Sequence, residues 1–195
     1  MRNIAILASG SGTNAENISN CLNNGTDIKV AVILSNKPDA GVHLRAKGFG
    51  IPSFTFTGAE FREGSPILRK LAEYEVDFIV LAGFLLKISG DIIRAYPDKI
   101  INIHPSLLPA FGGKGMYGDY VHQAVVAAKA VQTGITVHYV NDRYDEGAII
   151  FQKSCPVFPS DTADDVAARV HELEYKYYPA VIKELLGKEC RSKTG

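Results

Sequence analysis

The fold is decided by residues 4–15, which read Ile4-Ala5-Ile6-Leu7-Ala8-Ser9-Gly10-Ser11-Gly12-Thr13-Asn14-Ala15. Five apolar residues in a row are typical of a strand that is buried on both faces. The glycines after them predict a tight loop, and the residues from Asn14 to about Asn23 predict a helix. Such a strand, loop and helix form the repeating unit of α/β folds.

Strands and helices continue to alternate through the first hundred residues. Further strands are predicted at 28–34, 52–56, 77–82 and 100–103, and further helices at 42–47 and 65–74. Units of roughly thirty residues with this alternation favour right-handed crossovers and a parallel sheet covered on both faces. We therefore expect an α/β fold with a doubly wound, mostly parallel, Rossmann-like sheet.

The pattern changes after residue 130. The runs 136–140 and 148–152 are separated by a turn-like segment, residues 142–147, and they predict an antiparallel hairpin attached to the parallel part. An amphipathic pattern over 161–186 predicts a long C-terminal helix. Ser160 or Asp161 is the expected N-cap of this helix, and the polar residues after 186 are expected to fray. We expect one domain over residues 1–195.

Composition narrows the class of protein. Apolar residues make up 46% of the chain, and 21 basic residues balance 21 acidic ones, so there is no basic surplus of the kind that nucleic-acid binding needs. The longest apolar run, residues 78–86, is about half as long as a membrane span requires. The three cysteines, Cys21, Cys155 and Cys190, are widely spaced and indicate reduced thiols. The N-terminus has no signal-peptide cleavage site, and we expect a cytoplasmic protein that binds small molecules and no membrane.

The glycine-rich loop has the spacing G-x-G-x-x-A over residues 10–15. Small residues let a backbone approach an anion, and free N–H groups at a helix start point at it. A dinucleotide site also needs an acidic residue at the end of the second strand, but Leu34 is followed by Ser35-Asn36-Lys37. A phosphate on the substrate is therefore favoured over a dinucleotide, and a tight turn that binds nothing is the remaining alternative.

A second pattern, Asn102-Ile103-His104-Pro105, follows a predicted central strand. Residues two apart on a strand face the same side, so Asn102 and His104 project together where doubly wound sheets hold their ligands. An amide can hold a developing oxyanion and an imidazole can move a proton, which suits acyl transfer. A strand end followed by a proline turn explains the same pattern without any chemistry. A third partner is left open among Asp142, Asp145 and Glu146.

The other histidines give weaker indications of a functional role. His43 and His171 lie on predicted helices among polar neighbours and are expected at the surface, whereas His122 and His138 are expected to be structural. No set of His, Cys, Asp or Glu has metal-ligand spacing, so no metal is predicted.

Five segments of the chain resemble one known family, in order from residue 1 to about 186. They are Ala8-Ser9-Gly10-Ser11-Gly12-Thr13-Asn14, Leu81-Ala82-Gly83-Phe84, Asn102-Ile103-His104-Pro105-Ser106-Leu107-Leu108-Pro109, Gly134-Ile135-Thr136-Val137-His138 and Tyr144-Asp145-Glu146-Gly147. The sequence is similar to the folate-dependent formyltransferases, in the branch that acts on glycinamide ribonucleotide. The resemblance implies transfer of the formyl group of 10-formyltetrahydrofolate, as co-substrate, to the amine of that ribonucleotide.

The resemblance also implies the residues of the site. The catalytic residues would be Asn102, His104 and Asp145, with His104 protonated beside Asp145. The ribonucleotide would be held by Gly12, Thr13, Asn14 and Glu174, and the folate by Arg62, Leu85, Leu86, Lys87, Ile88, Asn102, Arg143 and Gly147. Residues from 1 to about 100 would then form the phosphate-binding half, and residues from about 101 to 186 the catalytic and folate-binding half. Either a monomer or a homodimer is compatible with this expectation.

The chain departs from the family pattern in two places. Residues 111–118, which hold four glycines, extend a connection that is usually short, and they predict either a mobile flap or a longer surface loop. Many relatives have an arginine at the position of Leu86, so folate contacts there are expected from the backbone. Arg62 is the candidate for the arginine that holds the folate tail.

Related functions fit less well. Methionyl-tRNA formyltransferases have a second, C-terminal domain, and formyltetrahydrofolate hydrolases have a second histidine where this chain has Pro105. Sugar-amine formyltransferases do not need Gly12-Thr13-Asn14 in this form. A nicotinamide oxidoreductase leaves Asn102 and His104 unexplained, and a non-catalytic nucleotide-binding module explains only the glycine-rich loop.

Overall fold

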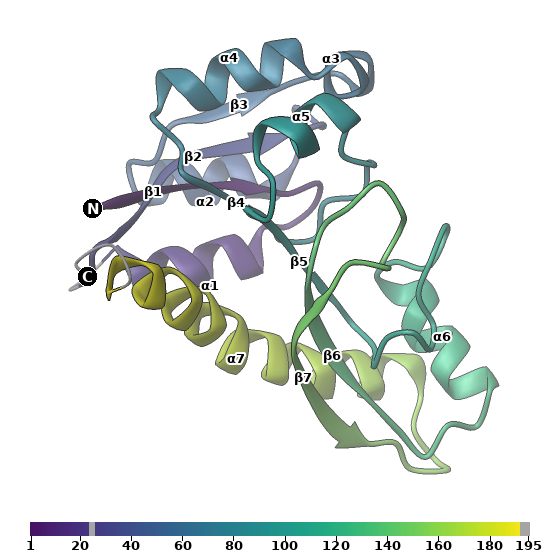
Figure 1. Cartoon of the computed structure of the whole chain (residues 1–195). Coiled ribbons are helices and arrows are strands. Elements are labelled where there is room, and N and C mark those ends of the chain that lie inside the picture. Colours follow the sequence, from purple (N-terminus) through teal and green to yellow (C-terminus); the bar gives the residue numbers. More distant parts are fainter. Residues whose placement is uncertain (24–25, 192–195) are drawn as a thin grey trace.

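The chain forms a single seven-stranded sheet in a computed structural model that describes residues 1–23 and 26–191 (Figure 1). The strand order is β3-β2-β1-β4-β5-β6-β7. The strands are β1 (Arg2–Leu7), β2 (Ile28–Ser35), β3 (Ser53–Thr55), β4 (Phe78–Leu81), β5 (Ile100–His104), β6 (Gln132–Tyr139) and β7 (Ile149–Pro156). Neighbouring strands from β3 to β5 are parallel, whereas β6 and β7 are antiparallel to their neighbours. The predicted doubly wound sheet with an antiparallel hairpin is confirmed.

The hairpin strands are longer than the sequence pattern predicts. The predicted strand 136–140 begins after Gly134, yet Gly134 pairs with Ser154 inside the ladder between β6 and β7. A Cβ atom at this position would overlap the carbonyl oxygen of Lys153. The glycine is therefore a place where two backbones approach closely rather than the end of a strand.

Seven helices cover the sheet within the described part of the chain. They are α1 (Thr13–Leu22), α2 (Gly41–Gly48), α3 (Gly58–Glu63), α4 (Ser65–Glu73), α5 (Gly90–Ala95), α6 (Asp119–Ala127) and α7 (Ala163–Arg191). The sequence analysis predicts no helix at α3, α5 or α6. Two of these, α3 and α5, have only six residues each, which is too short for an apolar period to be recognised. Over residues 1–23 and 26–191, no helix has both the length and the apolar character to cross a membrane.

Two hydrophobic layers lie on the two faces of the sheet. On β1, Ile4 and Ile6 belong to the core beneath α1, α2, α6 and α7, whereas Ala5 and Leu7 belong to the core beneath α3, α4 and α5. Figure 1 shows α4 and α7 on opposite sides of the sheet. The continuous apolar run of β1 therefore exists because both of its faces are covered.

The long C-terminal helix is confirmed, but its start differs from the prediction. α7 begins at Ala163, and its cap is Thr162 rather than Ser160 or Asp161. The Thr162 hydroxyl accepts from the N–H of Asp165, and the Asp165 carboxylate accepts from the N–H of Thr162. This reciprocal cap takes the place of the predicted one, because the Asp161 carboxylate binds Arg169 and the N–H of Phe158 instead. The helix also continues five residues beyond the predicted end, to Arg191, and the remaining residues lie outside the described part of the chain.

Candidate active site

A cavity of about 500 Å³ lies at the carboxyl ends of β1, β4 and β5. Its walls come from the segments 10–14, 81–88, 102–105 and 113–118, from the turn between β6 and β7, and from α6 and α7. Parallel strands place their carboxyl ends at one edge of the sheet, so segments far apart in the sequence meet there. This edge is therefore the candidate active site.

Three predicted catalytic side chains meet in this cavity. Asn102 and His104 lie two residues apart on β5, and Asp145 lies in the turn after β6. The Nδ1 atom of His104 is 3.6 Å from Oδ2 of Asp145. Only 3% of the His104 surface is exposed, so this imidazole sits in a largely dry environment. The structure therefore brings together the trio that the resemblance implies.

The extended loop between β5 and α6 holds two of these side chains by its backbone. The carbonyl of Phe111 accepts a hydrogen bond of 2.8 Å from Nε2 of His104, and the N–H of Gly113 donates one of 2.9 Å to Oδ2 of Asp145. Residues 113–118 of the same loop line the cavity. The loop is thus part of the site wall. Because Nε2 of His104 donates to a carbonyl, Nδ1 carries the lone pair in the neutral ring.

His138 lies beside the trio because of the strand register. It pairs with Asn102 across β5 and β6, and its Nε2 atom is 3.3 Å from Nδ2 of Asn102 and 3.6 Å from Oδ1 of Asp145. Its Nδ1 atom donates to the carbonyl of Tyr139 over 2.9 Å, so Nε2 of the neutral ring accepts from the amide of Asn102. His138 thereby turns one N–H of Asn102 toward itself and leaves the second for another acceptor.

The electrostatics of the trio differ in part from what the resemblance implies. Burial lowers the pKa of His104 below its ordinary value, and this outweighs the opposite effect of Asp145 and of the hydrogen bond to Phe111. Burial also acts to raise the pKa of Asp145, but His138, His104 and the N–H of Gly113 hold the pKa of this carboxyl below its ordinary value. Asp145 does favour the protonated imidazole, as expected, yet the net direction favours a neutral His104 beside an ionised Asp145.

The glycine-rich loop forms the opposite end of the cavity. Gly12 has a φ of 78°, and a Cβ atom there would lie 2.6 Å from Val42, so glycine is needed for the turn into α1. Residues 10–14 all line the cavity. Asn14 donates from Nδ2 to Oε2 of Glu174 over 2.9 Å, although the two residues are 160 positions apart. The predicted ribonucleotide-binding residues therefore form one connected group.

Two buried polar atoms of the cavity wall have no hydrogen-bond partner among the residues that the structure describes: Oδ1 of Asn14 and Nδ1 of His122. Both side chains line the cavity, and buried polar groups in native proteins are nearly always paired. Burial, followed by the nearby His171, lowers the pKa of His122, and burial raises the pKa of Glu174. A polar ligand with its own donors and acceptors is suited to such a surface.

The predicted folate-binding residues divide into two groups. Leu85, Leu86, Lys87, Ile88 and Arg143 line the cavity together with Asn102, whereas Arg62 and Gly147 do not. Arg62 lies on α3, and a Cβ atom at Gly58 would touch both Arg62 and Leu86, so the guanidinium lies near the side chain of Leu86. Gly147 packs under β6, where a Cβ atom would overlap the carbonyl oxygen of Tyr139. Its observed contacts are those of a packing residue.

Three histidines line the cavity although the sequence did not assign them to the site. They are His122, His138 and His171. His171 precedes Glu174 by about one helical turn on α7, and this spacing could have placed both on one face. The role of His138 depends on the register of β5 against β6, which the sequence pattern does not specify. No group of three His, Cys, Asp or Glu side chains suited to a metal ion occurs among the residues that the structure describes.

The chain matches a family described as formyl transferase over residues 2–182. It is 41% identical to phosphoribosylglycinamide formyltransferase of Bacillus subtilis strain 168, with 99% of each chain covered. It is 42% identical to the chloroplastic phosphoribosylglycinamide formyltransferase of Vigna unguiculata over 94% of its own length, but it spans only 61% of that protein. It is also similar to the crystal structure of phosphoribosylglycinamide formyltransferase from Bacillus halodurans, with 34% identity, a TM-score of 0.88, and 96% and 97% of the two chains covered.

Proposed function

The chain belongs to the formyl transferase family, and from this premise we propose that it is a phosphoribosylglycinamide-type formyltransferase of de novo purine biosynthesis. It transfers the formyl group of 10-formyltetrahydrofolate to the amine of N1-(5-phosphoribosyl)glycinamide and yields formylglycinamide ribonucleotide. One arrangement supports this function above all: a single cavity has an anion-binding loop at residues 10–14 and an Asn102–His104–Asp145 trio in its wall.

The ribonucleotide fits the end of the cavity formed by α1 and α7. The N–H groups at the start of α1, with Gly12 and Thr13, suit the phosphate because the helix N-terminus attracts an anion. Asn14 and Glu174 suit the hydroxyl groups of the ribose, which can donate to a carboxylate and to the unpaired Oδ1 of Asn14. The amine then points toward the trio.

The folate fits the other wall, between residues 85–88 and the turn that carries Arg143. Leu85 and Leu86 offer apolar side chains, which suit the faces of a flat heterocycle. The proximity of Arg62 to Leu86 supports a role of this guanidinium in binding the carboxylates of the folate tail. When bound, the folate supplies the formyl group.

The chemistry of the transfer follows from the hydrogen bonds of the trio. The lone pair on Nδ1 of neutral His104 accepts the proton that the substrate amine loses as it attacks the formyl carbon. The ring then becomes an imidazolium beside the ionised carboxylate of Asp145, which stabilises it. The free N–H of Asn102, with the charged ring, stabilises the oxyanion of the tetrahedral intermediate. The intermediate then collapses: the bond between the formyl carbon and N10 of the folate breaks, and the imidazolium returns its proton to that nitrogen.

We also propose a cytoplasmic location and small-molecule partners only, in a monomer or a homodimer. The free thiols of Cys21 and Cys155 are in keeping with a reducing compartment. The balanced charge of the chain is in keeping with substrates other than nucleic acid.

A spectrophotometric assay of the purified protein with a 10-formyl folate tests the proposed function. Formation of the deformylated folate only when glycinamide ribonucleotide is present supports the transfer. Deformylation without the ribonucleotide would instead indicate a hydrolase, and no reaction in either case would contradict the assigned acceptor.

A further inference from the structure

Ser9 holds the folate-side wall of the cavity at two points. Its N–H donates to the carbonyl of Gly83 over 3.0 Å, and its hydroxyl accepts from the N–H of Leu85 over 2.9 Å. The segment 83–88 forms neither helix nor strand, so its shape depends on such contacts. Only 2% of Ser9 is exposed, and a hydrogen bond in so dry a place is costly to lose.

Asn36 sets the direction of the Ser9 hydroxyl. The hydroxyl donates to Oδ1 of Asn36 over 2.6 Å, which directs an oxygen lone pair toward the N–H of Leu85. Asn36 follows the end of β2, the position where a dinucleotide-binding protein needs a carboxylate for the ribose. Here the side chain of Asn36 instead binds Ser9, which follows the end of the neighbouring strand β1, and so supports the 83–88 segment.

Neither Ser9 nor Asn36 lines the cavity. Leu85 does, and 42% of it is exposed in the absence of a ligand. The two hydrogen bonds from Asn36 to Ser9 and from Ser9 to Leu85 form a relay. This relay fixes the backbone of Leu85, while the side chain of Leu85 is open to the cavity. Ser9 also directly precedes the glycine-rich loop, so one residue connects the walls for the two substrates.

We propose that Ser9 and Asn36 are positioning residues for the folate: they fix the 83–88 segment and thereby set the affinity of the site for the co-substrate. This role rests on the proposed formyl transfer. The two residues have different requirements in this role. Asn36 only accepts a hydrogen bond, whereas Ser9 must both accept and donate one.

The test compares substitutions that break the relay with ones that keep it. Ser9→Ala removes the partner of the Leu85 N–H, and Asn36→Leu removes the acceptor of the Ser9 hydroxyl. Asn36→Asp keeps an acceptor oxygen at the same place and serves as the conservative variant. Ser19→Ala is the matched control, because Ser19 is also fully buried and its hydroxyl donates to a backbone carbonyl, that of Ala15, far from the 83–88 segment.

Titration calorimetry with a dideaza analogue of the formyl folate, and separately with glycinamide ribonucleotide, measures both affinities. We expect Ser9→Ala to weaken binding of the folate analogue about tenfold or more, since the N–H of Leu85 loses its partner in a partly buried place. Asn36→Leu should weaken it by a smaller factor, and Asn36→Asp and Ser19→Ala should leave it within about twofold. The affinity for the ribonucleotide should fall much less than that for the folate analogue.

Exchange of the Leu85 amide proton provides a readout without any ligand. It should become faster in Ser9→Ala and Asn36→Leu than in the wild type, and it should stay unchanged in Ser19→Ala. Unchanged affinity for the folate analogue in folded Ser9→Ala and Asn36→Leu, with a wild type that binds it, would overturn the positioning role alone. Equal losses for both substrates would overturn it as well. A wild-type protein that binds no folate analogue would overturn the proposed function and this role together.

Discussion

His104 is the residue whose surroundings constrain the chemistry most. Its Nε2 proton is held by the Phe111 carbonyl and its Nδ1 atom faces Asp145, so the proposed proton transfer is assigned to Nδ1. A buried neutral imidazole is a better proton acceptor than an exposed charged one, since only the neutral form has a lone pair. The carboxylate beside it then favours the charged ring that forms during the reaction.

Removal of either polar side chain of β5 should abolish most of the turnover. We expect Asn102→Ala and His104→Ala each to lose at least about 10²-fold in kcat, because each loses an oxyanion donor or a proton acceptor. Both variants should keep the circular dichroism spectrum of the wild type. Near-normal turnover in either purified, folded variant would contradict the assigned trio.

The titration of His104 should respond to Asp145 in a defined direction. Burial lowers the pKa of His104 and Asp145 raises it, so Asp145→Asn should lower the pKa of this ring further. The neutral form would then persist to a more acidic pH than in the wild type. NMR titration of the imidazole resonances measures this without reference to activity. A pKa of His104 that rises in Asp145→Asn, or that lies above the ordinary histidine value in the wild type, would contradict the proposed neutral state.

Among the elements, α7 combines a structural and a binding role. Val166, Val170 and Ile182 of this helix are fully buried in the core, while His171 and Glu174 of the same helix line the cavity. Glu174 is only 5% exposed, and its burial raises the pKa of the carboxyl above the ordinary value. A buried carboxylate of this kind destabilises the fold near neutral pH, and that cost decreases as the pH falls toward its pKa.

Glu174→Gln should therefore make the protein more stable but weaken its binding of the ribonucleotide. The amide oxygen still accepts from Asn14, but the buried charge is gone, so we expect the free energy of unfolding to rise by about 1 kcal/mol and Tm by roughly 2–4 °C near neutral pH. Affinity for glycinamide ribonucleotide should fall at least about tenfold, since a charged acceptor is lost. Calorimetry of unfolding and of binding measures both. A variant that is less stable than the wild type, or one that binds the ribonucleotide equally well, would argue against this assignment.

The hairpin of β6 and β7 positions Asp145 through a close backbone contact at Gly147. A side chain there would overlap the carbonyl of Tyr139, whose hydrogen bond with Nδ1 of His138 helps to orient that ring. Gly147→Ala should therefore displace the turn, lower Tm by several degrees and reduce kcat more than it raises KM for the folate. Gly187→Ala, at a helical position where a Cβ atom has open space, is the control. A pure rise in the folate KM would instead support direct contact of Gly147 with the folate.

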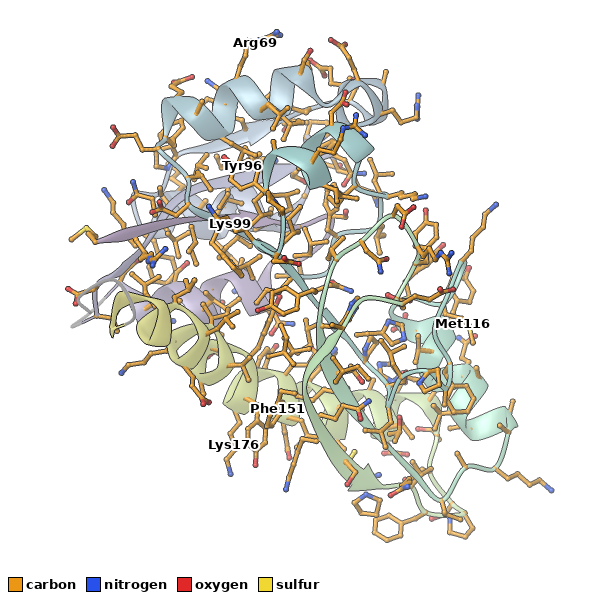
Figure 2. All side chains as sticks on the ribbon, viewed as in Figure 1. Arg69, Tyr96, Lys99, Met116, Phe151 and Lys176 are labelled. Carbon is orange, nitrogen blue, oxygen red and sulfur yellow. The ribbon has the colours of Figure 1, made fainter. Side chains whose placement is uncertain are left out.

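At the scale of the whole molecule, the strands of the parallel half could be predicted because each of them carries a local signal. The run Ile4 to Ala8, for example, alternates between two covered faces, and this leaves no polar position in it. The sequence pattern is misleading where a structure depends on distant residues. The predicted strand begins after Gly134, but this glycine lies within β6 because it allows a close approach of two strands. The cap of α7 is Thr162 because Asp161 is already paired with Arg169. Figure 2 shows that side chains from separate elements meet on both sides of the sheet.

In the candidate site, too, some residues could be predicted from local sequence and others could not. Asn102 and His104 could be found from their spacing on one strand, but the choice of Asp145 over Asp142 and Glu146 came from a family resemblance and not from the pattern. The contacts of His104 with Phe111 and of Asp145 with Gly113 use backbone atoms, for which residue types carry no signal. His138 needs the register of two strands to be recognised, and the register is a property of the folded sheet.

The bond between Asn14 and Glu174 also has a consequence for the order of synthesis on the ribosome. Translation produces the glycine-rich loop first and α7 last, whereas the trio in residues 102–145 is complete in between. A nascent chain that ends before Ala163 thus holds the proposed catalytic trio, yet it lacks Glu174 and the buried residues of α7. We therefore expect formyl transfer only from chains in which translation has delivered the final helix.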